Sequence, residues 1–301
     1  MFGLTGGREP VTATFWLIEA PDSLAVQSRR NPDGYGLATF DADGSPRVDK
    51  GPVAAWRDMR FAQLARETRS TTFVAHVRFA STGPMTHENT HPFEQDGRIF
   101  AHNGLVAGLE QLELELGRHR DLVSGDTDSE RLFTLITRRI HAAGGDVRRG
   151  IVSAVRWVAE ELPVYSMNFI LATPRELFAL RYPDVNPLFV LERDAGGPSG
   201  FRQLAHSSAG GTVRVRSDEL RVRPSVVIAS EPMDEDAGWR QVEPGQLIHV
   251  DANLNVSAEM ILPDPPAHQL ALEDLDVRAA ASQTEAGDSQ RQSRPAEPLA
   301  A

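Results

Sequence analysis

The sequence contains no cysteine among its 301 residues. Disulfide bonds, thiolate metal sites and a cysteine nucleophile are therefore excluded for this chain as written. The sequence also lacks any apolar run close to the roughly 20 residues that a membrane-spanning helix requires. Its start has no charged segment followed by an apolar one, as a secretory signal would have. We therefore expect a cytoplasmic protein with no membrane partner.

Positive charge is scarce, with 31 Lys and Arg against 42 Asp and Glu and a formal net charge of −11. Binding to nucleic acid or to anionic membranes depends on basic surface, so the sequence argues against both partners. From about residue 263 the composition turns to Pro, Ala, Gln, Ser and acidic residues. Such a segment buries too little apolar surface to fold, which predicts a domain over residues 1–262 and a disordered tail over 263–301.

Two short apolar segments, residues 73–79 and 98–102, have the composition of β-strands and end in polar and glycine residues. Side chains alternate along a strand, so Val74, His76 and Arg78 are expected on one face. A guanidinium at the end of a buried strand requires an anion. That anion is either a carboxylate of the same chain or a substrate carboxylate, which a guanidinium binds with two parallel hydrogen bonds.

The second segment is followed by the pair Asn103-Gly104, which also permits two interpretations. Asn-Gly between apolar runs is typical of a hairpin turn. Alternatively, the Asn103 amide and the Gly104 N–H supply the two donors that an oxyanion hole requires.

The rest of the chain predicts strands, then helices, then further strands. Thr127 followed by Glu130 is typical of a capping box at the start of the longest helix. Helices are expected over residues 55–69, 109–116, 127–141 and 147–162, and strands over residues 37–40, 168–173, 176–182, 187–191, 212–216, 225–230, 246–251 and 254–256. With few parallel βαβ units, this order favours stacked antiparallel sheets covered by helices.

Five motifs occur in a fixed order: NPDGYG, HVRFASTG, NTHPF, AHNG and GDTDSE. With them the sequence resembles the class II glutamine amidotransferases, a group of N-terminal-nucleophile hydrolases. The likeness extends over roughly residues 1–260 and is greatest to free-standing members that act on glutamine or γ-glutamyl compounds. It implies an α+β fold, a four-layer αββα sandwich, with no cofactor and with a separate ammonia-accepting synthase as one conceivable partner.

The resemblance also implies roles for individual residues. Arg78 is expected to bind the α-carboxylate of glutamine and Asp128 its α-ammonium, although acidic residues also favour the first turn of a helix for structural reasons. Asn103 and Gly104 are expected to stabilise the oxyanion of the tetrahedral intermediate. Further residues are expected to line or shape the pocket, namely Ser81, Thr82, Phe79, Asp33 and Tyr35.

One feature departs from the family pattern. The family nucleophile is an N-terminal cysteine whose own amine moves the proton, whereas this chain starts Met1-Phe2-Gly3-Leu4. One hypothesis is that translation was assigned to an internal methionine and that the native protein starts Met-Cys-Arg-Met-Phe-Gly-Leu. The alternative is a pseudoenzyme that binds glutamine or a γ-glutamyl ligand without turnover.

A third alternative is a metal-dependent hydrolase. His76, His91 and His102, with Asp33 or Asp128, are the residue types that bind zinc and related metals. Their spacing matches no compact metal-binding motif, so the sequence predicts no metal site.

Overall fold

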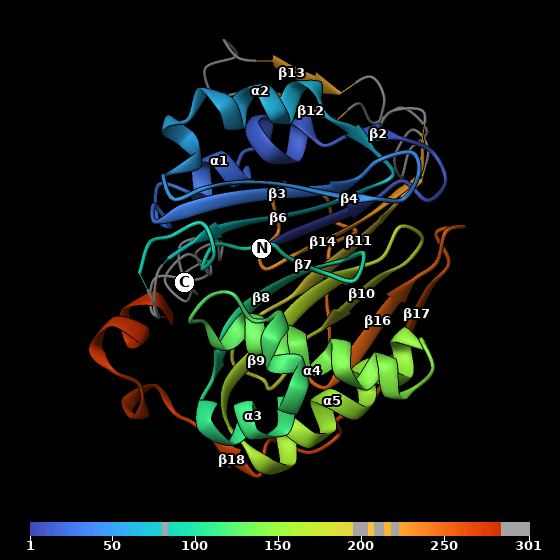
Figure 1. Ribbon diagram of the computed structural model, residues 1–301. Helices are drawn as coiled ribbons and strands as arrows, with labels where there is room; N and C mark the ends of the chain where they lie inside the picture. The colour runs from blue at the N-terminus through green and yellow to red at the C-terminus, as the bar shows by residue number, and fades with distance from the viewer. Residues whose placement is uncertain (80–83, 195–203, 208–213, 218–222, 284–301) are drawn as a thin grey trace, which may run out of the picture.

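The computed structural model describes residues 1–79, 84–194, 204–207, 214–217 and 223–283. Two large antiparallel sheets are stacked, and each carries helices on its outer face (Figure 1). The chain therefore has the αββα sandwich that its sequence predicted. Helices α1 (Leu24–Gln27) and α2 (Met59–Glu67) cover one sheet, and α3 (Leu109–Leu116), α4 (Asp128–Ala142) and α5 (Val147–Glu161) cover the other. None of the helices in the described ranges is long and apolar enough to cross a membrane.

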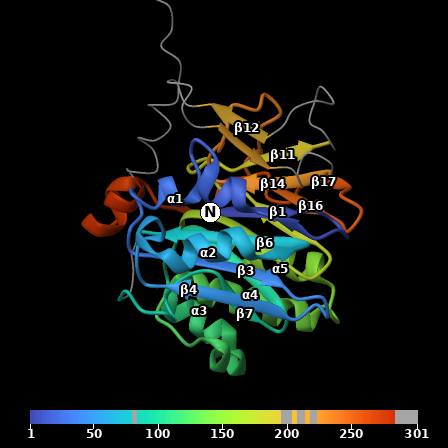
Figure 2. The same cartoon turned by 90° about the horizontal axis from the view of Figure 1, so that it is seen from above.

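The first sheet has seven strands with β1 at its centre, and Figure 2 shows them side by side. Their order is β15 (Arg240–Gln241), β11 (Phe189–Arg193), β14 (Ser225–Ala229), β1 (Phe2–Thr5), β6 (Thr72–Arg78), β3 (Gly34–Phe40) and β4 (Pro46–Gly51). Because β1 pairs with β14 on one side and β6 on the other, the start of the chain lies between two long neighbours.

The second sheet also has seven strands. Their order is β17 (Val256–Met260), β16 (Gln246–Val250), β10 (Leu177–Leu180), β9 (Pro163–Ala172), β8 (Arg98–Val106) and β7 (Phe93–Gln95), and β18 (His268–Gln269) pairs in parallel with β9. The remaining elements are the strand pairs β2 (Val11–Thr12) with β5 (Arg69–Ser70) and β12 (Leu204–Ser207) with β13 (Arg214–Ser217), a π-helical turn at Phe15–Glu19, and 3-10 turns at Ala55–Arg57, Gly117–Leu122 and Leu272–Asp274.

Strand alternation divides the buried apolar residues into three cores. On β6, Phe73, Ala75 and Val77 face α1 and α2, while Val74 packs between the sheets. On β8, Ile99 packs between the sheets and Phe100 packs under α4. Arg78 shares the parity of Val74, so the predicted alternation carries its guanidinium into the space between the two sheets.

Strand β8 continues through Asn103-Gly104, so the hairpin-turn interpretation of that pair is wrong. Asn103 pairs with Asn168 of β9, and Gly104 pairs with Met167. Glycine is required here for a steric reason, because a Cβ at residue 104 would lie 2.0 Å from the carbonyl oxygen of Ser166.

Several other predicted elements have different bounds, among them the following three. The segment predicted as one helix over residues 55–69 consists of a 3-10 turn followed by α2. Asp58 separates the two, because its side chain caps the start of α2 by accepting a hydrogen bond from the Arg60 N–H. The strand predicted at 254–256 instead runs over Val256–Met260, because Leu254 has a positive φ in the turn that precedes it. The strand predicted at 212–216 is described only from Arg214.

Residues 263–283, which composition assigned to a disordered tail, lie on the domain. The Ala267 N–H donates to the Ala159 carbonyl at 2.8 Å, and the Tyr182 hydroxyl donates to the Asp264 carbonyl at 3.0 Å. Backbone pairing through β18 therefore holds a segment that has little apolar surface of its own. The rest of the predicted tail, residues 284–301, lies outside the described residues.

Contact between Gly36 and the NTHPF motif joins the two sheets near the end of β6. A Cβ at residue 36 would lie 2.1 Å from the His91 carbonyl oxygen and 2.7 Å from Pro92. At Gly34, on the same strand, the nearest atoms to a Cβ lie at 3.3 Å. We expect Gly36→Ala to lower the free energy of unfolding by about 3 kcal/mol and Gly34→Ala by about 1 kcal/mol or less.

Urea unfolding of both variants measures this difference. Equal losses of stability at the two positions would contradict the role assigned to Gly36.

Candidate functional site

A cavity of about 110 Å³ lies between the sheets. It is lined by the end of β6 and by residues 102–104 of β8. Its walls come from both sheets, the first turn of α4 and the C-terminal segment. They include the four predicted residues Arg78, Asn103, Gly104 and Asp128, together with His76 and His102. Residues from all five motifs therefore meet in one place, although the lining residues run from Asn31 to Ser129 along the chain.

Arg78, at the end of β6, is 4% exposed and donates from Nη1 to the Pro84 carbonyl at 3.1 Å. Its own carbonyl accepts from the Asp33 N–H at 3.0 Å. Burial lowers the pKa of the guanidinium, and the Asp33 carboxylate opposes that shift. The structure therefore supplies both features that the sequence suggested, an internal carboxylate nearby and a cavity that the cation lines.

Asp128 is the first residue of α4 and is 6% exposed. Its Oδ2 accepts from the Val106 N–H at 2.9 Å. As predicted, the Thr127 side chain caps the helix by accepting from the Glu130 N–H. The Glu130 carboxylate does not reach back to the cap, because it accepts instead from the Ser124 and Gly125 N–H groups. Helix and strand together fix Asp128 against the cavity.

Asn103 has the same strand parity as Ile99 and Ala101, which pack between the sheets. Its carbonyl accepts from the Ser166 hydroxyl at 3.3 Å. Among the described residues, its side-chain amide has no hydrogen-bond partner, so its N–H groups are available to a ligand. Gly104 follows on the cavity wall.

Three buried histidines lie around these groups. The rings of His76 and His91 are 4.4 Å apart. The Nε2 of His102 lies 3.3 Å from the Ser166 carbonyl, and its Nδ1 lies 2.9 Å from the Ser129 hydroxyl. Because a carbonyl only accepts, Nε2 carries the proton and Nδ1 accepts. Burial lowers the pKa of all three rings, so they are neutral near pH 7.

The described residues contain no group of three or more His, Cys, Asp or Glu arranged to hold a metal ion. The metal-dependent alternative therefore gains no support from the described part of the chain.

The first residue of the NTHPF motif, Asn89, uses its side-chain amide to bind backbone groups of two other segments. Asn89 is buried, accepts from the Asp126 N–H at 2.8 Å and donates to the Pro84 carbonyl at 3.2 Å. It thereby links the GDTDSE motif to the same carbonyl that Arg78 binds. Of the remaining predicted residues, Phe79 lines the cavity and Tyr35 points away to donate to Asp58. Ser81 and Thr82 lie outside the described residues.

Sequence reasoning missed several lining residues, among them Met1, Ser230, Asn186 and Gln283. The Met1 amine donates to the Ser230 hydroxyl at 3.2 Å. Burial lowers the pKa of this amine to about 6, against the opposing charge of Glu231. No local motif marks these positions, because β1, β14 and the C-terminal segment meet only through the tertiary fold.

Comparison with known proteins agrees with this geometry. A family model described as class II glutamine amidotransferases matches residues 23–273. The γ-glutamyl-hercynylcysteine sulfoxide hydrolase of Mycolicibacterium smegmatis is 28% identical over 253 residues, covering 80% of this chain and 92% of the hydrolase. The probable glutamine amidotransferase DUG3 of Saccharomyces cerevisiae is 28% identical over 164 residues, or 48% of this chain, and the match spans only 46% of DUG3.

Among solved structures, a glutamine aminotransferase class-II domain protein from Silicibacter pomeroyi superposes with a TM-score of 0.58. It is 21% identical, and the match covers 87% of this chain and 99% of that one. At this identity the likeness shows the fold alone, which is the pair of stacked sheets between helices described above. With the family match over most of its length, the chain belongs to the class II glutamine amidotransferases.

The neutral histidines predict sensitivity to acid. Their ordinary pKa is 6.5 and burial lowers it, so below pH 6.5 the unfolded chain binds protons that the folded chain does not. Stability is therefore fully present above pH 6.5 and falls as the pH drops below it. In His91→Phe, the slope of unfolding free energy against pH should decrease by up to about 1.4 kcal/mol per pH unit.

Urea unfolding between pH 7.5 and 5 tests this. An unchanged slope in His91→Phe would show that the ring is already protonated in the folded state.

Proposed function

We propose that the cavity binds glutamine or a larger γ-glutamyl amide by its α-carboxylate and α-ammonium. We further propose that a form of the protein with a cysteine ahead of Met1 hydrolyses the γ-amide. The observation that carries this is the placement of Arg78 and Asp128. They are opposite charges, both nearly buried, and both line one cavity with Asn103 and Gly104.

The charges match the two ends of an amino acid zwitterion. Arg78 presents a fork that fits a carboxylate, and Asp128 presents an acceptor to an ammonium. Both side chains are nearly buried, so each interaction would be stronger than the same pair on the surface. A ligand held by both groups places its side chain along the cavity, toward the Asn103 amide.

The oxyanion donors would act at that other end. Attack on the γ-amide carbon converts its carbonyl oxygen to an oxyanion, which the Asn103 side-chain N–H and the Gly104 N–H would stabilise. Loss of one such donor typically costs a factor of about 10²–10³ in rate. Cleavage then releases ammonia or an amine, and water converts the thioester to glutamate and regenerates the thiol.

The attacking sulfur is the group that this chain does not have. A methionine thioether has no ionisable proton and forms no acyl intermediate, so Met1 does not replace it. In the sequence Met-Cys-Arg-Met1, the cysteine stands two residues ahead of Met1, a reach of at most about 7 Å. Met1 itself lines the cavity, so that reach keeps the sulfur beside the proposed oxyanion donors.

A second candidate is a binding protein without turnover, which the absence of cysteine favours for the chain as written. The similarity to a γ-glutamyl-hercynylcysteine sulfoxide hydrolase favours the hydrolytic proposal and a γ-glutamyl amide as substrate. A separate synthase that accepts the ammonia is a further proposal about partners.

The variant Asp128→Asn tests the proposed pairing between the Asp128 carboxylate and the α-ammonium of the ligand. This change removes the charge but keeps an oxygen that accepts from the Val106 N–H, so the fold is retained. Glutamine affinity measured by calorimetry should fall at least tenfold, about 1.4 kcal/mol. Glutaramate, which lacks the α-ammonium, should bind both proteins equally.

Asp126→Asn is the matched control, because Asp126 is exposed, precedes the same helix and does not line the cavity. Equal losses for glutamine and glutaramate in Asp128→Asn would contradict the pairing.

The requirement for a cysteine nucleophile is tested by extending the chain at its N-terminus. The chain with Met-Cys-Arg added ahead of Met1 should release glutamate from glutamine or γ-glutamyl amides, because its exposed cysteine supplies the nucleophile. The same extension with serine or alanine in place of cysteine should bind but show at least a 10³-fold lower rate, on the order of the loss of a nucleophile. Binding by every form with turnover by none would favour the second candidate.

A further inference from the structure

The C-terminal segment, residues 276–283, closes one side of the cavity. Asp276 Oδ1 accepts from the Arg278 and Ala279 N–H groups at 2.9 Å each and so starts a short helix that runs to residue 283. Ala279 is 1% exposed, so the helix is packed against the domain. In Figure 1 this helix, in red, lies at the edge of the sandwich near the open end between the sheets.

The last described residue, Gln283, is fixed at both ends of its amide. Its Oε1 accepts from Asn186 Nδ2 at 2.9 Å, and its Nε2 donates to the Ser282 hydroxyl at 3.3 Å. That hydroxyl donates to the Ala279 carbonyl at 2.7 Å. Gln283 is 8% exposed and lines the same cavity as Asn103. A long polar side chain therefore has one defined position on the cavity wall.

Asn186, the partner of Gln283, connects this side of the cavity to the proposed oxyanion donors. Its carbonyl and that of Pro187 accept from the Asn168 amide at 3.0 and 3.2 Å. Asn168 is the strand partner of Asn103 in the β8–β9 register. Side chains of directly opposed residues lie about 5 Å apart on the same face. Gln283 therefore connects through two asparagines to the amide end of the site.

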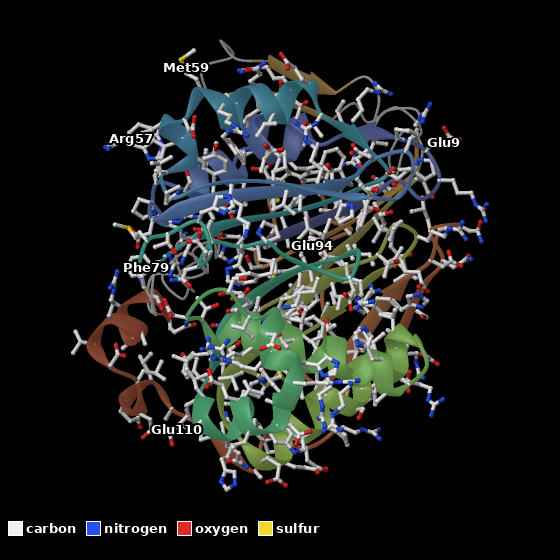
Figure 3. All side chains as sticks on the ribbon, viewed as in Figure 1. Glu9, Arg57, Met59, Phe79, Glu94 and Glu110 are labelled. Carbon is white, nitrogen blue, oxygen red and sulfur yellow. The ribbon has the colours of Figure 1, made fainter. Side chains whose placement is uncertain are left out.

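The same segment also extends toward the carboxylate end. The charge of Arg278 adds to burial in lowering the pKa of Arg78. Phe79, which follows Arg78 and is labelled in Figure 3, lines the same cavity as Gln283. The segment thus brings the Arg278 charge within electrostatic range of Arg78 and places Gln283 on the cavity wall.

We propose that Gln283, held by Asn186, limits the size of the group that a substrate carries on its γ-amide nitrogen. Gln283 is then a specificity-determining residue of the proposed glutamine or γ-glutamyl site, and the inference rests on that proposed function. Glutamine carries only hydrogen on this nitrogen, whereas γ-glutamyl amides carry a substituent that would extend toward this wall. Shortening Gln283 opens space for the substituent and leaves the two charged contacts unchanged.

The test compares two ligands with identical α-groups, glutamine and γ-glutamylanilide, by calorimetry on the full chain as written. In Gln283→Ala the ratio of anilide Kd to glutamine Kd should fall about tenfold, because the shorter side chain enlarges the pocket by the volume of a few non-hydrogen atoms. Asn186→Ala, which frees Gln283 without shortening it, should shift the ratio in the same direction. Gln269→Ala is the matched control, since Gln269 is exposed on β18 and should leave the ratio unchanged.

The outcomes separate the two proposals. If glutamine binds and the ratio is the same in Gln283→Ala and Asn186→Ala as in the unsubstituted chain, the wall has no role in selection and this inference is overturned alone. If the unsubstituted chain binds neither ligand, the proposed function fails and this inference fails with it. If both ligands weaken equally in Gln283→Ala, the side chain supports the fold only.

Discussion

The close approach of β8 to β9 at Gly104 is the contact on which the site depends. A side chain there would meet the Ser166 carbonyl at 2.0 Å, so the two strands pair closely only because residue 104 is glycine. Their register shifts just beyond, between Leu105 and Val106. The Val106 N–H then donates to Asp128 at the start of α4. The absence of a side chain at Gly104 thereby helps to determine where the Asp128 carboxylate lies in the cavity.

Burial strengthens the electrostatic interactions that Asp128 and Arg78 make with other groups. Arg78 and Asp128 each have partners within the protein, yet both are nearly buried and both line the cavity between the two sheets. The surrounding histidines are neutral because their rings are desolvated. Under the proposed function, a protonated His102 would compete with the ligand's ammonium for Asp128, and the lowered pKa of His102 avoids that competition.

Local rules predicted the parts of the site that depend on local structure. Strand alternation correctly put Arg78 on the same face as Val74, and capping chemistry correctly started α4 at Thr127. The Asn-Gly pair was ambiguous because a turn and a tight strand contact both select glycine, and only the position of β9 decides between them. Nothing local could reveal Gln283, whose partner Asn186 stands almost 100 residues earlier.

The chain separates the two tasks of an amidotransferase domain, namely holding the amino acid and attacking its side chain. Under the proposed function the first task depends on Arg78 and Asp128, which both line one cavity. The second requires a thiolate, and the sequence contains no cysteine. Under the proposed function, a γ-glutamyl ligand bound by this chain would meet charged and hydrogen-bonding groups but no cysteine sulfur. Its affinity then reports ground-state recognition alone, which in an active relative is measured together with acylation.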